Sequence, residues 1–191
     1  MTELYTIGHS SHSFNRFVTY LKSCKVDTVI DVRSNPYSRF HSQYRYKALK
    51  AGLPDANIDY IFLGKQLGAR SKDPAYYIDG RVSYRLLAKS PVFQEGLKEL
   101  QRMIRAARVG IMCAEKDPLD CHRMVLVCRH FRDQPVEIRH ILADGSVEAH
   151  PDTEKRLIKR AGLDQPDLFP PPGDIVERAY DLQAEAIVLR S

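Results

Sequence analysis

The residues best suited to chemistry follow the apolar run 109–112, in the stretch CAEKDPLDCHR. Cys113 and Glu115 open this stretch, and Cys121, His122 and Arg123 close it. Thiol, carboxyl and imidazole groups attack electrophiles or transfer protons, and guanidinium groups bind phosphate or carboxylate. We therefore expect a chemical site where the buried element before Cys113 ends.

Glu115 is the carboxylate that we expect to transfer protons. It follows an apolar run and precedes Asp117. Both desolvation and a neighbouring negative charge raise the pKa of a carboxyl group toward the range that is useful for proton transfer. An ion pair with Arg33 or Arg123 is the structural alternative, and the two roles are compatible.

Cys113 is a second catalytic candidate, because arginines and a helix N-terminus near a thiol lower its pKa. The segment lacks the Cys-x5-Arg pattern of a cysteine phosphatase, since Arg123 comes ten positions after Cys113. A phosphocysteine intermediate is therefore not expected. Cys121 and Cys128 follow a helical spacing, so both are alternatively small hydrophobic residues that face a sheet.

A metal site is the rival interpretation of the same residues. The side chains able to serve as ligands are His9, Cys113, Glu115, Cys121 and His122. The chain has no Cys-x2-Cys pair, and the adjacent residues Cys121 and His122 would point about 100 degrees apart on a helix. We therefore predict no metal and no other cofactor, and keep a thiol or metal site as a lesser alternative.

Composition favours a globular protein with one main domain. The chain has 191 residues, 43% of them hydrophobic, which is enough to bury a core. No apolar run approaches the length of a membrane span, and the first residues lack the pattern of a signal peptide, so we expect a cytoplasmic protein. Its four cysteines are expected as reduced thiols. A net charge of +5 is compatible with a polyanionic partner but does not establish one.

One segment interleaves basic and aromatic residues in a way that suits nucleic acid. The residues concerned are Arg33, Tyr37, Arg39, Phe40, Tyr44, Arg45, Tyr46, Lys47 and Lys50. Cations contact phosphates, and aromatic rings stack on bases. A solvated loop and helix, with long side chains lying over apolar surface, is the alternative.

Short apolar runs alternate with amphipathic stretches along most of the chain, as in strand and helix units that form a parallel sheet. The expected strands are LYTIGHS, DTVIDVRS, IDYIFLG, VGIMCAE and VEIRHIL, and DGSVEAH is expected to be a turn and short extension. The predicted fold is α/β, a three-layer Rossmann-like open sheet. It is mostly parallel, with about five strands and helices on both faces. A single α/β domain is expected over residues 1–165.

Caps and prolines mark where helices should begin. The expected starts are Ser13, Pro91, Asp117 with Pro118, and either Asp152 or Thr153. Asp120 falls where a capping box places its acid, and Gly162 should end the last of these helices. The prolines of DQPDLFPPPGD exclude regular structure there. Residues 166–191 are predicted to be a Pro-rich linker and a C-terminal helical extension, exposed or docked on a partner.

In an open α/β sheet, ligands lie beyond the carboxyl ends of the strands, where loops and helix N-termini converge. These ends are polar in this chain. They carry Gly8, His9 and Ser10 after the first strand, Asp31, Arg33, Ser34 and Asn35 after the second, Gly64 after the third, and Cys113 and Glu115 after the fourth. Parallel strands would bring them into one crevice. A structural role is the usual alternative for a lone histidine such as His9.

The chain resembles the protein family called domain of unknown function 488. The resemblance rests on TIGHSSHS, DVRSNPYSR, LGKQLGAR and CAEKDPLDCHR, which occur in this order within residues 4–145. It implies no particular activity. The residues that match motif positions are His9, Ser10, Asp31, Arg33, Pro36, Ser38, Arg39, Gly64, Gly68, Arg70, Cys113, Glu115, Cys121, His122 and Arg123.

Two functions of different classes fit these residues. The first is a small hydrolase-like enzyme that acts on a nucleotide, a nucleic-acid base or another phosphorylated ligand. Its expected catalytic residues are Glu115, His9, Cys113 and Asp31. Its expected substrate-binding residues are Ser10, Arg33, Ser34, Pro36, Ser38, Arg39, Gly64, Gly68, Arg70, His122 and Arg123. The second is a non-catalytic module that binds nucleic acid or a partner through the same basic rim, and the C-terminal segment is a candidate homodimer contact.

Overall fold

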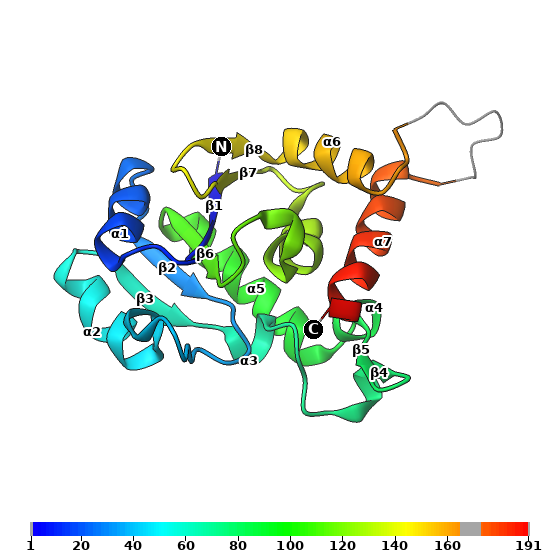
Figure 1. Ribbon diagram of the computed structural model, residues 1–191, viewed down its shortest axis with the longest axis horizontal. Coiled ribbons are helices and arrows are strands. Elements are labelled where there is room, and N and C mark those ends of the chain that lie inside the picture. Colours follow the sequence, from blue (N-terminus) through cyan, green and yellow to red (C-terminus); the bar gives the residue numbers. More distant parts are fainter. Residues whose placement is uncertain (1, 165–172, 191) are drawn as a thin grey trace.

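A six-stranded sheet forms the centre of the molecule (Figure 1), which the computed structural model describes over residues 2–164 and 173–190. Its strands are β1 (Thr2–Gly8), β2 (Thr28–Asp31), β3 (Asp59–Phe62), β6 (Val109–Cys113), β7 (Val136–Ile141) and β8 (Val147–Ala149). They lie in the order β3-β2-β6-β1-β7-β8. The first four pairings in this order are parallel, and β8 is antiparallel to β7. The predicted α/β sheet is confirmed, and the extension after residue 145 adds β8 as a sixth strand.

Helices cover both faces of this sheet, as predicted. They are α1 (Phe14–Ser23), α2 (Tyr46–Asp55), α3 (Gly64–Leu67), α4 (Tyr84–Leu87), α5 (Pro91–Ala106), α6 (His150–Arg160) and α7 (Ile175–Arg190). Alternate side chains of a strand point to opposite faces, so Tyr5 and Ile7 pack with α1 and α2, whereas Leu4 packs with α5. Between α3 and α5, a small hairpin pairs β4 (Tyr77–Ile78) with β5 (Arg81–Val82).

The predicted Ser13 cap is present, and the helix predicted to begin at Pro91 is capped by the residue before it. The Ser13 hydroxyl accepts a hydrogen bond from the Arg16 N–H at 3.3 Å at the start of α1, and Ser90 accepts one from the Phe93 N–H at 3.2 Å at the start of α5. Such caps satisfy N–H groups that have no partner within the helix. They fix both helices where the sequence placed them.

The predicted start of α6 is wrong. This helix begins at His150, before either Asp152 or Thr153. Pro151 fits the first turn because its missing N–H would have no partner there. The Thr153 hydroxyl donates to Glu148 Oε2 at 2.7 Å within the fold, and so it does not act as the cap.

The continuous helix expected from Asp117 is also wrong. Asp117 caps only a single tight turn, Pro118–Asp120. Cys121 then adopts an extended backbone, with φ −135° and ψ 139°. Helical turns resume over residues 123–131, where the buried apolar side chains anchor them in the core. Asp120 forms an ion pair with a basic residue of α6 instead of closing a capping box.

The C-terminal helix α7 buries one face on its own chain, where the sequence predicted a helix either exposed or docked on a partner. Figure 1 shows it (red) running from the end of α6 toward α4 and β5. Ala179 and Tyr180 are fully buried and belong to the main hydrophobic cluster, whereas Leu182 remains exposed. The expected linker lies mostly in residues 165–172, outside the described ranges. The homodimer contact stays a prediction.

A buried row of polar side chains connects the sheet to α7. Thr6 Oγ1 lies 2.8 Å from His140 Nδ1, and His140 Nε2 lies 2.8 Å from His150 Nδ1. His150 Nε2 in turn lies 3.0 Å from the Tyr180 hydroxyl. A neutral imidazole donates through one nitrogen and accepts through the other, as this row requires. The contacts between sheet and helix therefore depend on neutral histidines.

We expect the free energy of unfolding to fall as the pH drops from 6.5 toward about 4. Burial, aided by the positive charge of Arg132, lowers the pKa of His150 from 6.5 to about 4, and burial also lowers the pKa of His140. The unfolded chain therefore binds more protons than the folded one in this window, which favours unfolding. His150 alone contributes about 3 kcal/mol to this loss.

Urea denaturation at pH about 7.5 and about 4.5 measures this effect. The groups that face or influence the two rings are Glu154, Tyr180 and Arg132 at His150, and Thr6, Arg123 and Arg156 at His140. His150→Gln removes one titrating ring and should reduce the pH dependence. Equal free energies of unfolding of the wild type at the two pH values would contradict the prediction.

In the described part of the chain, no helix combines the length and the apolar character that crossing a membrane requires.

Candidate functional site

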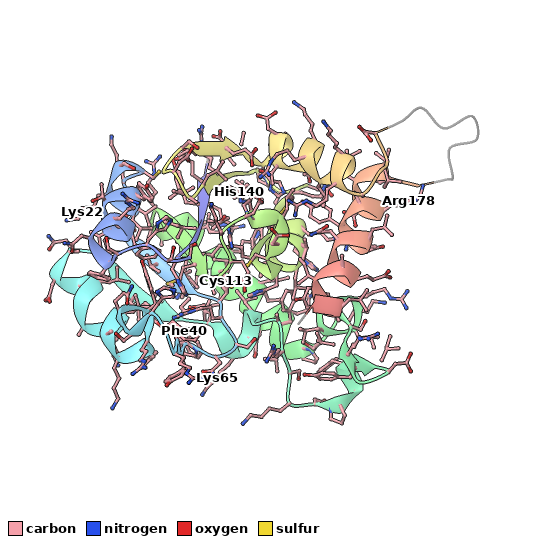
Figure 2. All side chains as sticks on the ribbon, in the orientation of Figure 1. Lys22, Phe40, Lys65, Cys113, His140 and Arg178 are labelled. Atoms are coloured by element: carbon pink, nitrogen blue, oxygen red, sulfur yellow. The ribbon has the colours of Figure 1, made fainter. Side chains whose placement is uncertain are left out.

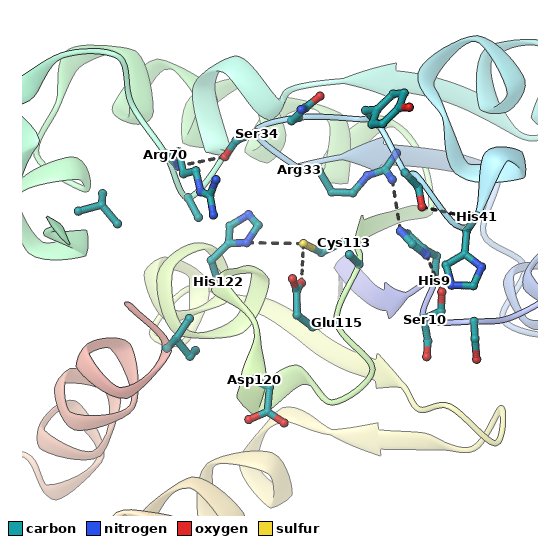
Figure 3. Close-up of a pocket in the computed structure, with 18 of the residues that line it drawn as sticks. His9, Ser10, Arg33, Ser34, His41, Arg70, Cys113, Glu115, Asp120 and His122 are labelled. Carbon is teal, nitrogen blue, oxygen red and sulfur yellow. Dashed lines mark hydrogen bonds between the residues drawn. The ribbon is translucent and has the colours of Figure 1, made fainter. Parts of the chain in front are cut away.

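A cavity of about 630 Å³ opens beyond the carboxyl ends of β1, β2 and β6 (Figure 3). Predicted site residues that line it are His9, Ser10, Arg33, Ser34, Ser38, Arg70, Cys113, Glu115 and His122. Parallel strands place their carboxyl ends along one edge of a sheet, which is why residues so distant in sequence meet here. The expected convergence of the strand ends is therefore present.

Close backbone contact between the ends of β1 and β6 shapes one side of the cavity. The His9 N–H donates to the Cys113 carbonyl oxygen and the Ser10 N–H to that of Ala114, both at 2.9 Å. A Cβ atom on Gly8 would lie 1.8 Å from the Glu115 carbonyl oxygen, so a side chain there would push the two loops apart. Glycine is required at this approach.

Four side chains with metal-ligand and nucleophilic atoms gather at the floor of the cavity, three of which line it, whereas Cys121 is buried next to them. Glu115 Oε2 lies 2.9 Å from the sulfur of Cys113 and 2.9 Å from that of Cys121. His122 Nδ1 lies 3.6 Å from the Cys113 sulfur and 3.9 Å from the Cys121 sulfur. Figure 3 shows the Cys113 sulfur between the His122 ring and the Glu115 carboxylate. We call these four residues the thiol cluster.

The protein surroundings change the proton affinities within the thiol cluster. Desolvation, with a contribution from Cys121, raises the pKa of Glu115, and burial raises the pKa of Cys113. Burial would also raise the pKa of Cys121, but the hydrogen bond from Cys113 and the charge of Arg123 hold it well below its usual range. The positive charge of Arg123 therefore favours a thiolate within the cluster.

A buried ion pair supports the opposite wall. Arg33 Nε and Nη2 donate to the Asp31 carboxylate at 2.9 and 2.7 Å. The Tyr60 hydroxyl donates to the same carboxylate at 2.8 Å, and Arg33 Nη2 also donates to the Tyr44 carbonyl oxygen at 2.7 Å. Arg33 Nη1 lies 3.3 Å from His9 Nε2. The positive charge of Arg33 is thus paired within the protein.

The same network holds His9 in one orientation. Its ring stacks on Tyr44, with centroids 4.1 Å apart, and its Nδ1 lies 2.9 Å from the Ser10 carbonyl oxygen. A carbonyl can only accept, so Nδ1 carries the hydrogen and Nε2 accepts from Arg33. Burial lowers the pKa of His9 to about 4. The ring is therefore neutral at neutral pH.

Arg70 brings a cation into the cavity from the loop after α3. Its backbone N–H donates to the Ser34 hydroxyl at 3.0 Å, which joins the loops that follow β2 and α3. Within residues 2–164 and 173–190, no carboxylate forms an ion pair with its guanidinium. Asp120, also at the cavity, pairs with Arg160 at 2.8 Å. Arg70 therefore has its charge available for an anionic ligand.

A family model described as domain of unknown function DUF488 matches residues 13–129, more than half of the chain. The chain belongs to the DUF488 family. The match confirms the resemblance seen in the sequence motifs, and it includes Arg33, Arg70 and the thiol cluster, although most of the TIGHSSHS motif precedes it. No curated protein and no solved structure matches this DUF488 protein.

Some predicted site residues of this DUF488 protein do not line the cavity. They are Asp31, Pro36, Arg39, Gly64, Gly68 and Arg123. Asp31 is fully buried behind Arg33. A Cβ atom on Gly64 would lie 1.9 Å from the Arg33 carbonyl oxygen, so the absence of a side chain there lets α3 approach the loop after β2.

Arg123 is fully buried, and Arg39 lies on the outer surface. Arg123 Nη1 donates to the Glu115 carbonyl oxygen at 2.8 Å, and Nη2 donates to that of Lys116 at 3.4 Å. These bonds hold the loop that carries Glu115. The Arg39 guanidinium lies 5.6 Å from the ring centroid of the exposed Phe40, which Figure 2 labels along with the buried Cys113.

Several cavity residues were not predicted as site residues. They include His41, Val82, Tyr84 and Ile187. Val82 and Tyr84 come from the insert between α3 and α5, and Ile187 comes from α7, so tertiary packing alone brings them here. Cys121, predicted both as a possible ligand and as a core residue, is buried in the hydrophobic core with its sulfur 2.9 Å from Glu115 Oε2. Asp117 followed by Pro118 can begin a single turn as well as a helix. This was the sequence signal that could have indicated the break at Cys121.

Proposed function

We propose that this DUF488 protein is a small hydrolase-like enzyme that acts on a nucleotide or another phosphorylated ligand bound in the cavity. The proposal rests mainly on one observation about the residues that line the cavity. The available cation Arg70 and the carboxylate Glu115 line the same cavity, which is the combination that anion binding and proton transfer need.

The phosphate-binding part of the proposal rests on Arg70 and nearby hydroxyls. A guanidinium binds phosphate through two parallel N–H groups. Ser34 and Ser38 also line the cavity and can donate to phosphate oxygens. Arg33 already makes four side-chain hydrogen bonds within the protein, so we assign it to positioning His9 and the loop after β2.

The rim of the cavity supports a ligand that carries a base. Tyr37 lines the cavity and is 59% exposed, and the Arg45 guanidinium lies 4.7 Å from its ring centroid. Phe40, close by in the chain, is 84% exposed. Exposed aromatic rings next to arginines provide stacking surfaces for nucleobases.

We assign the proton-transfer role to Glu115. Its carboxylate opens to the cavity, where it can take a proton from the water that attacks the ligand. His9 is less suited to this role because its Nε2 accepts a hydrogen bond from Arg33. Cys113 lies within hydrogen-bonding distance of Glu115 and serves as a neighbour that orients the carboxylate.

The test is Arg70→Ala. Isothermal titration with a panel of nucleoside mono-, di- and triphosphates and inorganic phosphate should find a ligand that the wild type binds and the variant binds less well. A charge-assisted hydrogen bond contributes about 1.5–3 kcal/mol, equivalent to about 10-fold to 150-fold in affinity. Arg105→Ala, an exposed arginine on α5, is the matched control and should leave affinity unchanged. Equal affinities of Arg70→Ala and wild type, or no binding of any panel member, would sink the proposal.

A non-catalytic nucleic-acid-binding module is the second candidate, and the exposed rings of Tyr37 and Phe40 favour it. Such a module would bind nucleic acid at the same rim of the cavity, and Glu115 would transfer no proton. Turnover therefore distinguishes the two candidates.

A further inference from the structure

We propose that Cys113, Cys121 and His122 bind a zinc ion at the floor of the cavity, with Glu115 on its open side. This site goes beyond the proposed function and does not depend on the identity of the ligand. It also replaces the prediction of no metal, whose geometric premise was that Cys121 and His122 share a helix. The extended backbone of Cys121 removes that premise, because it lets both side chains turn toward Cys113.

The spacing of the donor atoms suits a tetrahedral ion. Zinc binds thiolate sulfur at about 2.3 Å and imidazole nitrogen at about 2.0–2.1 Å, so the sulfur and nitrogen of one tetrahedral site lie about 3.5 Å apart. The distances from His122 Nδ1 to the sulfurs of Cys113 and Cys121 are 3.6 and 3.9 Å. All four donor atoms of the thiol cluster lie within 4.8 Å of one another. Small side-chain rotations would complete the geometry.

The hydrogen bond of His122 Nε2 fixes the ring in the tautomer that leaves Nδ1 free to bind a metal. Nε2 lies 3.0 Å from the carbonyl oxygen of Val32. Because a carbonyl only accepts, Nε2 carries the hydrogen, and Nδ1 presents its lone pair to the two sulfurs. Zinc-binding histidines are commonly oriented in this way by a bond from the other ring nitrogen to a backbone carbonyl.

The surroundings of Cys121 favour a metal-bound thiolate. The backbone N–H of Arg123 lies 3.4 Å from the Cys121 sulfur and points to it as a donor. The fully buried guanidinium of Arg123 adds a positive charge beside the cluster. Binding of Zn²⁺ releases the two thiol protons to solvent, and the two thiolates then balance the charge of the ion.

The three proposed ligands are buried, whereas the fourth residue of the thiol cluster, Glu115, is exposed. Cys113, Cys121 and His122 are 3%, 1% and 6% exposed, whereas Glu115 is open to the cavity. Three protein ligands with one open position are typical of catalytic zinc, and four are typical of structural zinc. The Glu115 carboxylate, whose Oε2 lies 2.9 Å from both sulfurs, would face such an ion from the cavity side.

Titration of chelator-treated protein with Zn²⁺, in competition with a chromophoric chelator, tests the site. We expect one ion per chain in the wild type. Changes next to a zinc ligand cost about 10–100-fold in affinity, so removal of a ligand in Cys121→Ser or His122→Ala should cost more than about 100-fold. Cys24→Ser, at a cysteine outside the cavity, should bind as the wild type does. Glu115→Gln should retain the ion.

Two further readouts keep the test decisive if a variant folds poorly. Co²⁺ added to the wild type should give the thiolate-to-metal absorption of a sulfur-bound ion. Zn²⁺ should also protect two thiols of the wild type from alkylation. Absence of both effects, or wild-type zinc affinity no higher than that of a folded Cys121→Ser variant, would overturn the site. Neither measurement uses a phosphorylated ligand, so this failure is distinct from failure of the Arg70→Ala test.

Discussion

Glu115→Gln lowers the turnover number by about 10²–10⁴-fold and leaves ligand affinity unchanged, if the carboxylate accepts a proton in the reaction. Glutamine keeps the size of the side chain and can place an oxygen where Glu115 Oε2 lies, 2.9 Å from the sulfurs of Cys113 and Cys121. It cannot take a proton at neutral pH. The loss therefore falls on the chemical step rather than on binding.

The measurement combines steady-state kinetics with titration of the ligand identified through the Arg70 experiment. Glu95→Gln, at an exposed carboxylate on α5, is the matched control and should keep full activity. Turnover by Glu115→Gln equal to that of the wild type would remove the proton-transfer role. In that case the binding module becomes the better description.

Asp31→Asn destabilises the folded protein by about 3–5 kcal/mol, because it leaves the buried guanidinium of Arg33 without its negative partner. The Asp31 carboxylate is fully buried and accepts bonds from Arg33 and Tyr60. Tyr60→Phe removes one of those bonds and should cost only about 0.5–1.5 kcal/mol.

Urea denaturation at pH about 7.5 gives the free energies of unfolding for both variants. Asp59→Asn, at an exposed position of β3, changes stability by less than about 0.5 kcal/mol and serves as the control. A similarly small effect of Asp31→Asn would show that the ion pair with Arg33 is not the support of the cavity wall.

The sheet could be predicted from sequence because its signals are local. Buried parallel strands read as apolar runs, and β6 is buried along its whole length. Ser13 and Ser90 mark helix starts through bonds to N–H groups only three residues away. The cavity followed from one topological rule, which is that parallel strands end at the same edge.

Features that depend on distant parts of the chain were not predicted. The polar row from Thr6 to Tyr180 joins residues at opposite ends of the sequence, and no local pattern around His140 or His150 predicts these contacts. The break at Cys121 had a similar cause. The helical spacing of residues 121–128 fits a continuous helix, whereas Cys121 has an extended backbone and its sulfur lies against Glu115.

A crystal structure of the protein grown with a nucleoside 5′-monophosphate would show directly whether the cavity binds a phosphorylated ligand. We expect the phosphate to contact the Arg70 guanidinium and the Ser34 hydroxyl, with the reacting atom near Glu115 and the base toward Tyr37. A nucleotide bound on another face of the molecule, or a cavity that stays empty at saturating nucleotide, would contradict this expectation.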